Sequence, residues 1–277
     1  MKNFKTFSLM LLLSIFFMSC SKEESAMIPN QPESNLPPDF KGFFKIFGDT
    51  GIGAGAWLAK DVVVLFDINA SNYAWIENGV VKDIRKVSDE NSIFQNLPQS
   101  GPSAAVVLKK SLYFFATGGK SYSTIVFNHD QVQGKWNDPS FFDVRNSSFL
   151  LSQWGVDNSA PFEGVSAAFA WHPDRHCDIK VDNRERLFHL NIDQPEISTY
   201  NDEVGTFSNT VAISNYGLYE CTNNIKSGLN LNSIVDAAFI YPVNGKVYEV
   251  FFFNNGTDFM YSEIGQNTTS EVYSIKM

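Results

Sequence analysis

The sequence predicts an all-β domain, arranged as a four-bladed β-propeller, over residues 40–277. Short apolar runs rich in β-branched and aromatic residues, such as residues 62–66, 112–115 and 247–253, are bounded by turn signals. No long window keeps the period of a helix. A small-residue motif recurs four times along the chain, which is typical of a repeat architecture.

The start of the chain has the pattern of an export signal. Lys2 and Lys5 precede an apolar run over residues 7–18, which is shorter than the roughly 20 residues that a membrane-spanning helix needs. The run ends at Ser19 and Cys20, where a small residue directly before a cysteine resembles a lipobox. We therefore expect residues 1–19 to be removed and Cys20 to carry the lipid that anchors the protein to a bilayer. An ordinary signal peptide with a chance cysteine is the alternative.

Residues 20–39 are predicted to form a flexible tether. This stretch contains four prolines and few apolar residues, so it cannot bury enough surface to fold alone. The charged segment at residues 21–24 resembles the surface-export signals of lipoproteins in Bacteroidetes-type bacteria. That resemblance implies an outer-membrane lipoprotein facing the cell exterior, and a solvated linker is the alternative reading of the same charges.

The charge of the chain limits its partners. Loss of Lys2 and Lys5 from the 21 basic residues leaves 19 against 30 acidic ones, a net charge of about −11. Such a surface repels nucleic acid over a Debye length of about 8 Å. Proteins, neutral glycans, small ligands and cations are the expected partners, besides the bilayer reached through Cys20.

Four alanines mark the repeat. Taking them as equivalent positions, the spacings are 50, 63 and 70 residues, for Ala54, Ala104, Ala167 and Ala237. In a small propeller, a tiny side chain at this position lets each innermost strand approach the central axis. A β-sandwich built from the same strands is the alternative.

The last repeat resembles the hemopexin-like repeat family. Its aspartate–alanine–alanine opening is Asp236-Ala237-Ala238, and an aromatic second strand, a glycine-containing hairpin and a tyrosine-bearing third strand follow at residues 247–253, 254–256 and 259–261. The second repeat, with residues 103–105 and 112–115, is a fair match. The sequence departs from the family at the opening acid, which is replaced by Gly53, Ser103 and Ser166 in the other repeats.

The resemblance implies a four-bladed disc whose axial channel is ringed by backbone carbonyls and often holds a calcium or sodium ion. Asp236 could contribute to that ring, since hard cations favour oxygen ligands. Close packing of small residues is the alternative role for the motif. Members of the family commonly act as binding or docking modules.

A second candidate metal site lies at residues 172–178. His172, His176 and Cys177 could converge on a transition metal, but Pro173 breaks any helical pairing of the two histidines, and the sequence favours a polar hairpin loop over a metal site here. Cys177 and Cys221 are the only other thiols, and in an oxidising compartment they could form a disulfide or stay free.

Motifs for catalysis are missing from the sequence. It contains no nucleophile elbow, no His-Glu-x-x-His helix and no phosphate loop. The acidic pairs at residues 89–90 and 202–203 lie in polar connections, where solvated charges are expected. The sequence therefore favours a binding module over an enzyme, with a hydrolase acting on extracellular glycans as the alternative function.

Overall fold

The computed structural model places a compact unit at Asn35–Met277. It describes residues 35–59, 61–90, 92–95, 102–108, 111–116, 121–127, 142–150, 165–170, 184–189, 196–201, 206–207, 211–212, 217–218, 226–228, 234–264, 266 and 269–276. No helix among these residues is both long and apolar enough to cross a membrane.

The described strands form four antiparallel sheets of four or five strands and one small two-stranded sheet. Blade 1 contains β1 (Ile52–Ala59), β2 (Val62–Asp67), β3 (Asn72–Glu77) and β4 (Val80–Lys86). Blade 2 contains β5 (Pro102–Leu108), β6 (Ser111–Ala116), β7 (Ser121–Phe127) and β8 (Phe142–Leu150). Blade 3 contains β9 (Val165–Ala170), β10 (Arg184–His189), β11 (Glu196–Asn201), β12 (Thr206–Phe207) and β13 (Val211–Ala212). Blade 4 contains β16 (Ala237–Val243), β17 (Lys246–Phe253), β18 (Asp258–Glu263) and β19 (Tyr273–Ser274).

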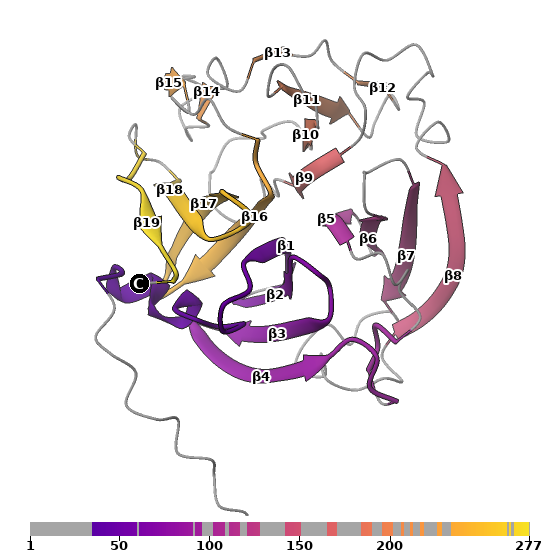
Figure 1. Cartoon of the computed structure of the whole chain (residues 1–277). Coiled ribbons are helices and arrows are strands. Elements are labelled where there is room, and N and C mark those ends of the chain that lie inside the picture. The colour runs from indigo at the N-terminus through magenta and orange to yellow at the C-terminus, as the bar shows by residue number, and fades with distance from the viewer. Residues whose placement is uncertain are drawn as a thin grey trace, which may run out of the picture. The chain divides into compact units, whose positions relative to one another are not determined.

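The first strands of the four blades form a closed ring. Strand β1 contacts β5 and β16, and β9 contacts the same two strands. In Figure 1 these four strands surround one centre, and the later strands of each blade lie progressively farther out. This radial order is that of a four-bladed β-propeller, so the predicted fold class is confirmed. A β-sandwich would stack two sheets face to face and would not produce such a ring.

The recurring alanines occupy the innermost strands, as the repeat predicted. All four are buried with exposed fractions of 1% or less, at Ala54, Ala104, Ala167 and Ala237. The longest repeat, which separates the last two of them, also contains the two-stranded sheet of β14 (Gly217–Leu218) and β15 (Lys226–Gly228). The 70-residue spacing therefore includes two short strands that lie outside the four blades.

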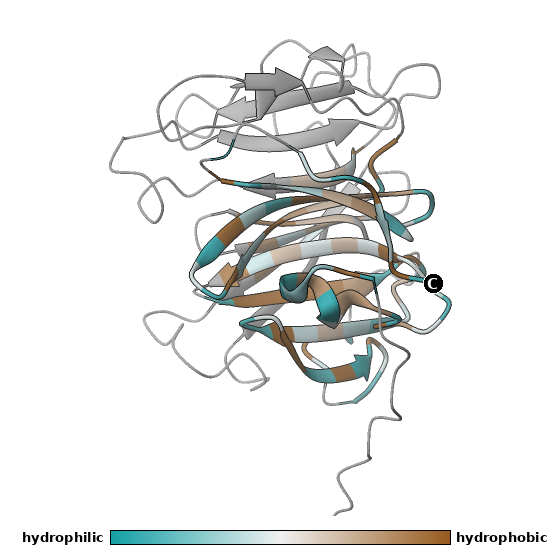
Figure 2. Ribbon diagram, turned by 90° about the vertical axis from the view of Figure 1, so that its left-hand side faces the viewer, coloured by the Kyte–Doolittle hydropathy of each residue, from teal (hydrophilic) through white to brown (hydrophobic). Residues whose placement is uncertain are grey.

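Burial along the strands follows their distance from the ring. All but the first residue of β17 are buried, whereas β4, the last strand of blade 1, has no buried residue. Figure 2 shows hydrophobic residues along the strands and hydrophilic ones mainly at the turns. Inner strands packed on both faces read as continuous apolar runs, which is why the sequence marks them so clearly.

Two-residue loops join neighbouring strands at one end of the blades. Asn78 and Gly79 connect β3 to β4, and Asn244 and Gly245 connect β16 to β17. All four residues have positive φ angles, between 48° and 79°. This is the geometry of a type I′ hairpin turn, which asparagine and glycine adopt most readily.

The ring is closed between blade 1 and blade 4 by backbone contacts. The N–H of Ile52, at the start of β1, donates to the carbonyl of Gly256 in the β17–β18 turn at 2.8 Å. The N–H of Lys45 donates to the carbonyl of Ile275 at 3.0 Å. The two ends of the repeat array are therefore joined through main-chain hydrogen bonds.

The compact unit begins before the boundary expected from the sequence. Residues 35–39 were expected to belong to the tether, but Leu36 is buried in an apolar cluster of the propeller and Pro38 starts the 3₁₀ helix η1 (Pro38–Phe43). Proline suits a first helical position because it lacks the N–H that would be unpaired there. We call residues 35–43 the N-terminal strap.

Candidate functional site

The axis of the ring is narrow. Opposite inner strands β5 and β16 approach with Cα atoms within 8 Å of each other. Ala104 of β5 and Ala237 of β16 lie on these two strands, and both are buried.

Asp236, the proposed contributor to an axial ion site, stabilises a turn. Its Oδ2 accepts a hydrogen bond from the N–H of Gly256 at 3.0 Å, and its own N–H donates to the carbonyl of Phe252 at 2.8 Å. Burial raises the pKa of the Asp236 carboxyl, and the hydrogen bonds from the N–H groups of Gly256 and Asn255 partly oppose this. The carboxylate thus holds the turn that closes the ring, and its role toward an ion stays a prediction.

The other predicted site residues lie outside the described residues. These are Cys20, His172, His176, Cys177 and Cys221. Among the residues that the structure describes, no group of three His, Cys, Asp or Glu side chains could hold a metal ion. The acidic residue Asp89 accepts a hydrogen bond from the N–H of Lys86 at 3.3 Å, as expected of a polar turn.

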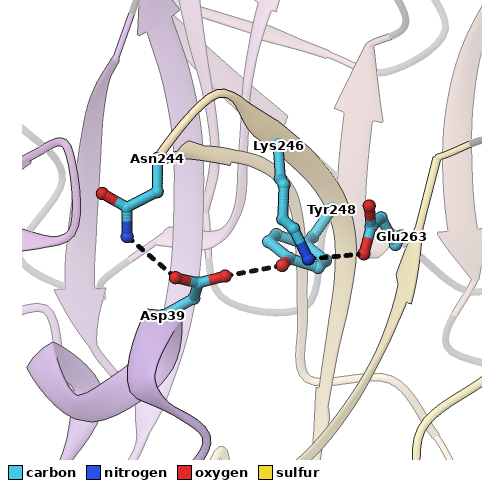
Figure 3. Close-up of polar contacts among 5 residues, drawn as sticks. All are labelled: Asp39, Asn244, Lys246, Tyr248 and Glu263. Atoms are coloured by element: carbon cyan, nitrogen blue, oxygen red, sulfur yellow. Dashed lines mark hydrogen bonds and ion pairs between the residues drawn. The ribbon is translucent and has the colours of Figure 1, made fainter.

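The most elaborate polar cluster in the described part of the chain surrounds Asp39 of the strap (Figure 3). The hydroxyl of Tyr248 donates to its Oδ2 at 2.6 Å, and the side-chain amide of Asn244 donates to its Oδ1 at 2.8 Å. The hydroxyl of Tyr241 donates to its backbone carbonyl at 3.1 Å. One residue of the strap therefore binds three side chains of blade 4.

The electrostatics of this cluster keep its donors protonated. Burial raises the pKa of the Tyr248 hydroxyl, and the hydrogen bond to the Asp39 carboxylate raises it further. Burial also raises the pKa of Tyr241. Both phenols therefore stay neutral at any physiological pH and act as hydrogen-bond donors rather than as bases.

Aromatic side chains seat the strap in blade 4. Phe40 is 1% exposed, and its ring stacks on that of Tyr261 with centroids 4.3 Å apart. Phe43 is fully buried, and the centroid of its ring lies 4.8 Å from that of Tyr241 and 5.7 Å from that of Phe252. The strap is thus a packed part of the propeller that links its first and last blades.

A neighbouring ion pair lies outside this packing. The Nζ of Lys246 is 3.1 Å from Oε2 of Glu263, and about half of the lysine side chain is exposed. Lys246 also lies over the ring of Tyr248, at 5.9 Å from its centroid. Exposed pairs of this kind contribute little to stability.

Replacing Asp39 by alanine is expected to lower the free energy of unfolding by about 1.5–3 kcal/mol, because two donors lose a charged acceptor. Tyr248→Phe is expected to lower it too, and the double variant should lose less than the sum of the two single losses, because the partners share one interaction. Urea denaturation of the four proteins measures the coupling.

The exposed Lys246 provides the control for this cycle. Lys246→Ala should leave the free energy of unfolding almost unchanged, because an exposed ion pair contributes little to stability. Strictly additive losses for Asp39→Ala and Tyr248→Phe would show that the carboxylate and the phenol do not interact in solution.

Sequence reasoning missed the strap because residues 35–39 looked like the end of a linker. A weak signal was present, since Leu36, Phe40, Phe43 and Phe44 recur at spacings of three and four, with two prolines between the first two of them. This spacing indicates one helical turn with an apolar face. Nothing local to the segment identifies its partners, which lie more than 200 residues away.

Fold and site together define the class of this protein, a four-bladed propeller whose N-terminal strap is packed on its last blade. No protein-family model and no curated protein matches the chain. The assignment of the class therefore rests on the strand order and contacts described above.

Solved structures give distant similarities. The chain is 7% identical to the Dos1 propeller, with a TM-score of 0.33, over 81% of this chain and 48% of that one. It is 11% identical to a chain of a nidogen–laminin complex, with a TM-score of 0.40, over 81% and 80% of the two chains. It is 8% identical to the Cps50 (Swd1) β-propeller domain of Myceliophteria thermophila, with a TM-score of 0.30, over 74% and 51%. The chain thus spans about half of the first and third of these chains.

Proposed function

We propose that this protein is a lipid-anchored, surface-exposed binding module of the outer membrane, with a hemopexin-like propeller that holds a protein, glycan or small ligand. The observation that carries the anchoring is the apolar run that ends at Ser19 and Cys20. The compact unit starts at Asn35, so about 14 residues remain between the lipidated cysteine and the folded domain. A tether of this length leaves the propeller free to meet a partner.

The construction of the described blades supports binding rather than catalysis. Asp39 of the strap and Asp236 accept hydrogen bonds from tyrosine, asparagine and backbone donors of blade 4. Asp67 is similarly engaged, since it accepts hydrogen bonds from the N–H of Ser71 and the side-chain amide of Asn72, both at 2.7 Å. These carboxylates serve the fold, and no specific observation favours the glycan hydrolase. A calcium or sodium ion in the axial channel is part of the proposal.

Replacing Cys20 by serine should abolish lipid attachment and release the protein from the membrane. The thiol is the atom that forms the thioether, and two or three acyl chains are needed for stable anchoring. We expect wild-type protein to incorporate an alkyne fatty acid and to sediment with membranes, whereas Cys20→Ser should do neither.

Cys221→Ser is the matched control, because it removes another thiol and leaves the anchor intact. It should label and sediment like the wild type. Equal labelling of Cys20→Ser and wild type would overturn the anchoring. Protease treatment of intact cells tests surface exposure, and a protein that stays protected would contradict it. Surface cross-linking of intact cells tests binding, and the lack of any reproducible adduct would contradict it.

A further inference from the structure

The sequence contains three asparagine–glycine dipeptides, and all three lie in described turns, at Asn78–Gly79, Asn244–Gly245 and Asn255–Gly256. This dipeptide has a characteristic chemistry. The backbone nitrogen of the glycine attacks the asparagine Cγ, a five-membered succinimide forms, and ammonia leaves. Water then opens the ring to aspartate or isoaspartate. The reaction needs a glycine nitrogen that is accessible and an asparagine amide that is free to approach it.

The structure protects the Asn255 turn. The N–H of Gly256 donates to Oδ2 of Asp236 at 3.0 Å, and Gly256 is buried. The backbone around it is also packed tightly against Ile52. The attacking nitrogen is therefore occupied and shielded from the base that must deprotonate it.

The Asn78 turn is partly protected. Oδ1 of Asn78 accepts a hydrogen bond from the N–H of Asn244 at 2.7 Å, which fixes the orientation of its side chain. Gly79 is half-buried, and its α-carbon faces the side chain of Val243. Movement of the Asn78 amide toward the Gly79 nitrogen requires this contact between the two hairpin turns to open.

The Asn244 turn is the accessible one. Asn244 and Gly245 are both exposed, and no heavy atom lies within 4 Å of the position that a Cβ on Gly245 would occupy. The strand ladder pairs Val243 with Lys246, so the nitrogen of Gly245 lies in the loop outside that ladder. Among the contacts described above, the Asn244 side chain takes part in one, the hydrogen bond from its amide to Oδ1 of Asp39.

We propose that Asn244 is a site of spontaneous deamidation and that its modification loosens the N-terminal strap. In the unmodified protein, the amide nitrogen of Asn244 lies 2.8 Å from Oδ1 of Asp39 and donates a hydrogen bond to it. Deamidation replaces this amide by a carboxylate. The hydrogen bond is lost, and the two negative carboxylates repel each other. The isoaspartate product also lengthens the backbone of a two-residue loop. This inference is independent of the lipid anchor.

The first test compares the three turns in one sample. The folded, full-length protein is incubated at mildly alkaline pH, and the mass increase of about 1 Da that replacement of NH₂ by OH requires is followed by peptide mapping. We expect Asn244 to react first, Asn78 more slowly and Asn255 last. In urea the three rates should converge, because the turns are lost. Equal rates in the folded protein, or faster reaction at Asn255, would overturn the proposal.

The second test measures the strap itself through trypsin cleavage after Lys41, an exposed residue within η1. Asn244→Asp mimics the product and should be cleaved roughly tenfold faster than wild type, since proteolysis follows the population of the open state and a hydrogen bond to a charged group is lost. Asn78→Asp is the matched control. It adds a negative charge at the adjacent turn but keeps the side-chain oxygen that accepts the hydrogen bond from the N–H of Asn244. Wild-type behaviour of Asn244→Asp, or equal acceleration in both variants, would refute the effect on the strap.

Discussion

Gly256→Ala is expected to open the ring between blade 1 and blade 4, with a loss of more than about 4 kcal/mol in the free energy of unfolding. Gly256 has a φ of 69°, and a Cβ on it would overlap the carbonyl oxygen of Ile52 and lie 2.6 Å from the Ile52 nitrogen. Both are backbone atoms, and the Ile52 nitrogen donates the closing hydrogen bond, so no side-chain rotation can relieve the overlap.

Gly245 provides the matched control for this substitution. Its φ of 75° is nearly the same, but nothing lies within 4 Å of a Cβ placed there. Gly245→Ala should therefore lower the free energy of unfolding by only about 1–2 kcal/mol, the energy of placing an L-residue in the left-handed conformation. Urea denaturation of both variants separates the two contributions, and equal losses would mean that the Ile52 contact can relax and does not fix the ring.

Phe40→Ala is expected to destabilise the protein by about 3–5 kcal/mol, the range for removal of a fully buried phenylalanine. Phe40 comes from the strap, and its ring lies 4.3–5.6 Å from the rings of Phe43, Tyr241, Tyr248, Phe259 and Tyr261. The loss should appear in urea denaturation and as faster trypsin cleavage after Lys41.

Val272→Ala serves as the control because the valine is 54% exposed. Its effect should stay within about 0.5 kcal/mol, as for most surface substitutions. A loss for Phe40→Ala as small as that of Val272→Ala would show that the strap is not part of the cooperative fold.

The ring could be predicted from the sequence because its signals are local and repeated. Ala54, Ala104, Ala167 and Ala237 mark four strands that must approach one axis, and small residues are needed at each. The β17–β18 turn was predicted from its asparagines and glycine, which adopt positive φ angles as expected. Local chemistry therefore identified the blades and one of their turns.

The strap could not be predicted, because its stability comes from partners distant in the chain. Asp39 follows two prolines in a polar stretch, where a carboxylate is normally solvated. Only the folded ring brings Tyr248 and Asn244 to it. The hydrogen bond from the N–H of Gly256 to Asp236 was also not predicted, since the sequence cannot show that these two groups face each other.

The strap has a consequence for the order of folding. The hydrogen bond between Asp39 and Tyr248 joins residues 209 positions apart, so the domain has contacts of very high sequence separation. Loop closure over such a distance slows folding, as in other topologies of high contact order. During synthesis the strap emerges before its aromatic partners on blade 4. A chain interrupted before blade 4 therefore leaves the rings of Phe40 and Phe43 without their partners, and such exposed apolar surface promotes aggregation.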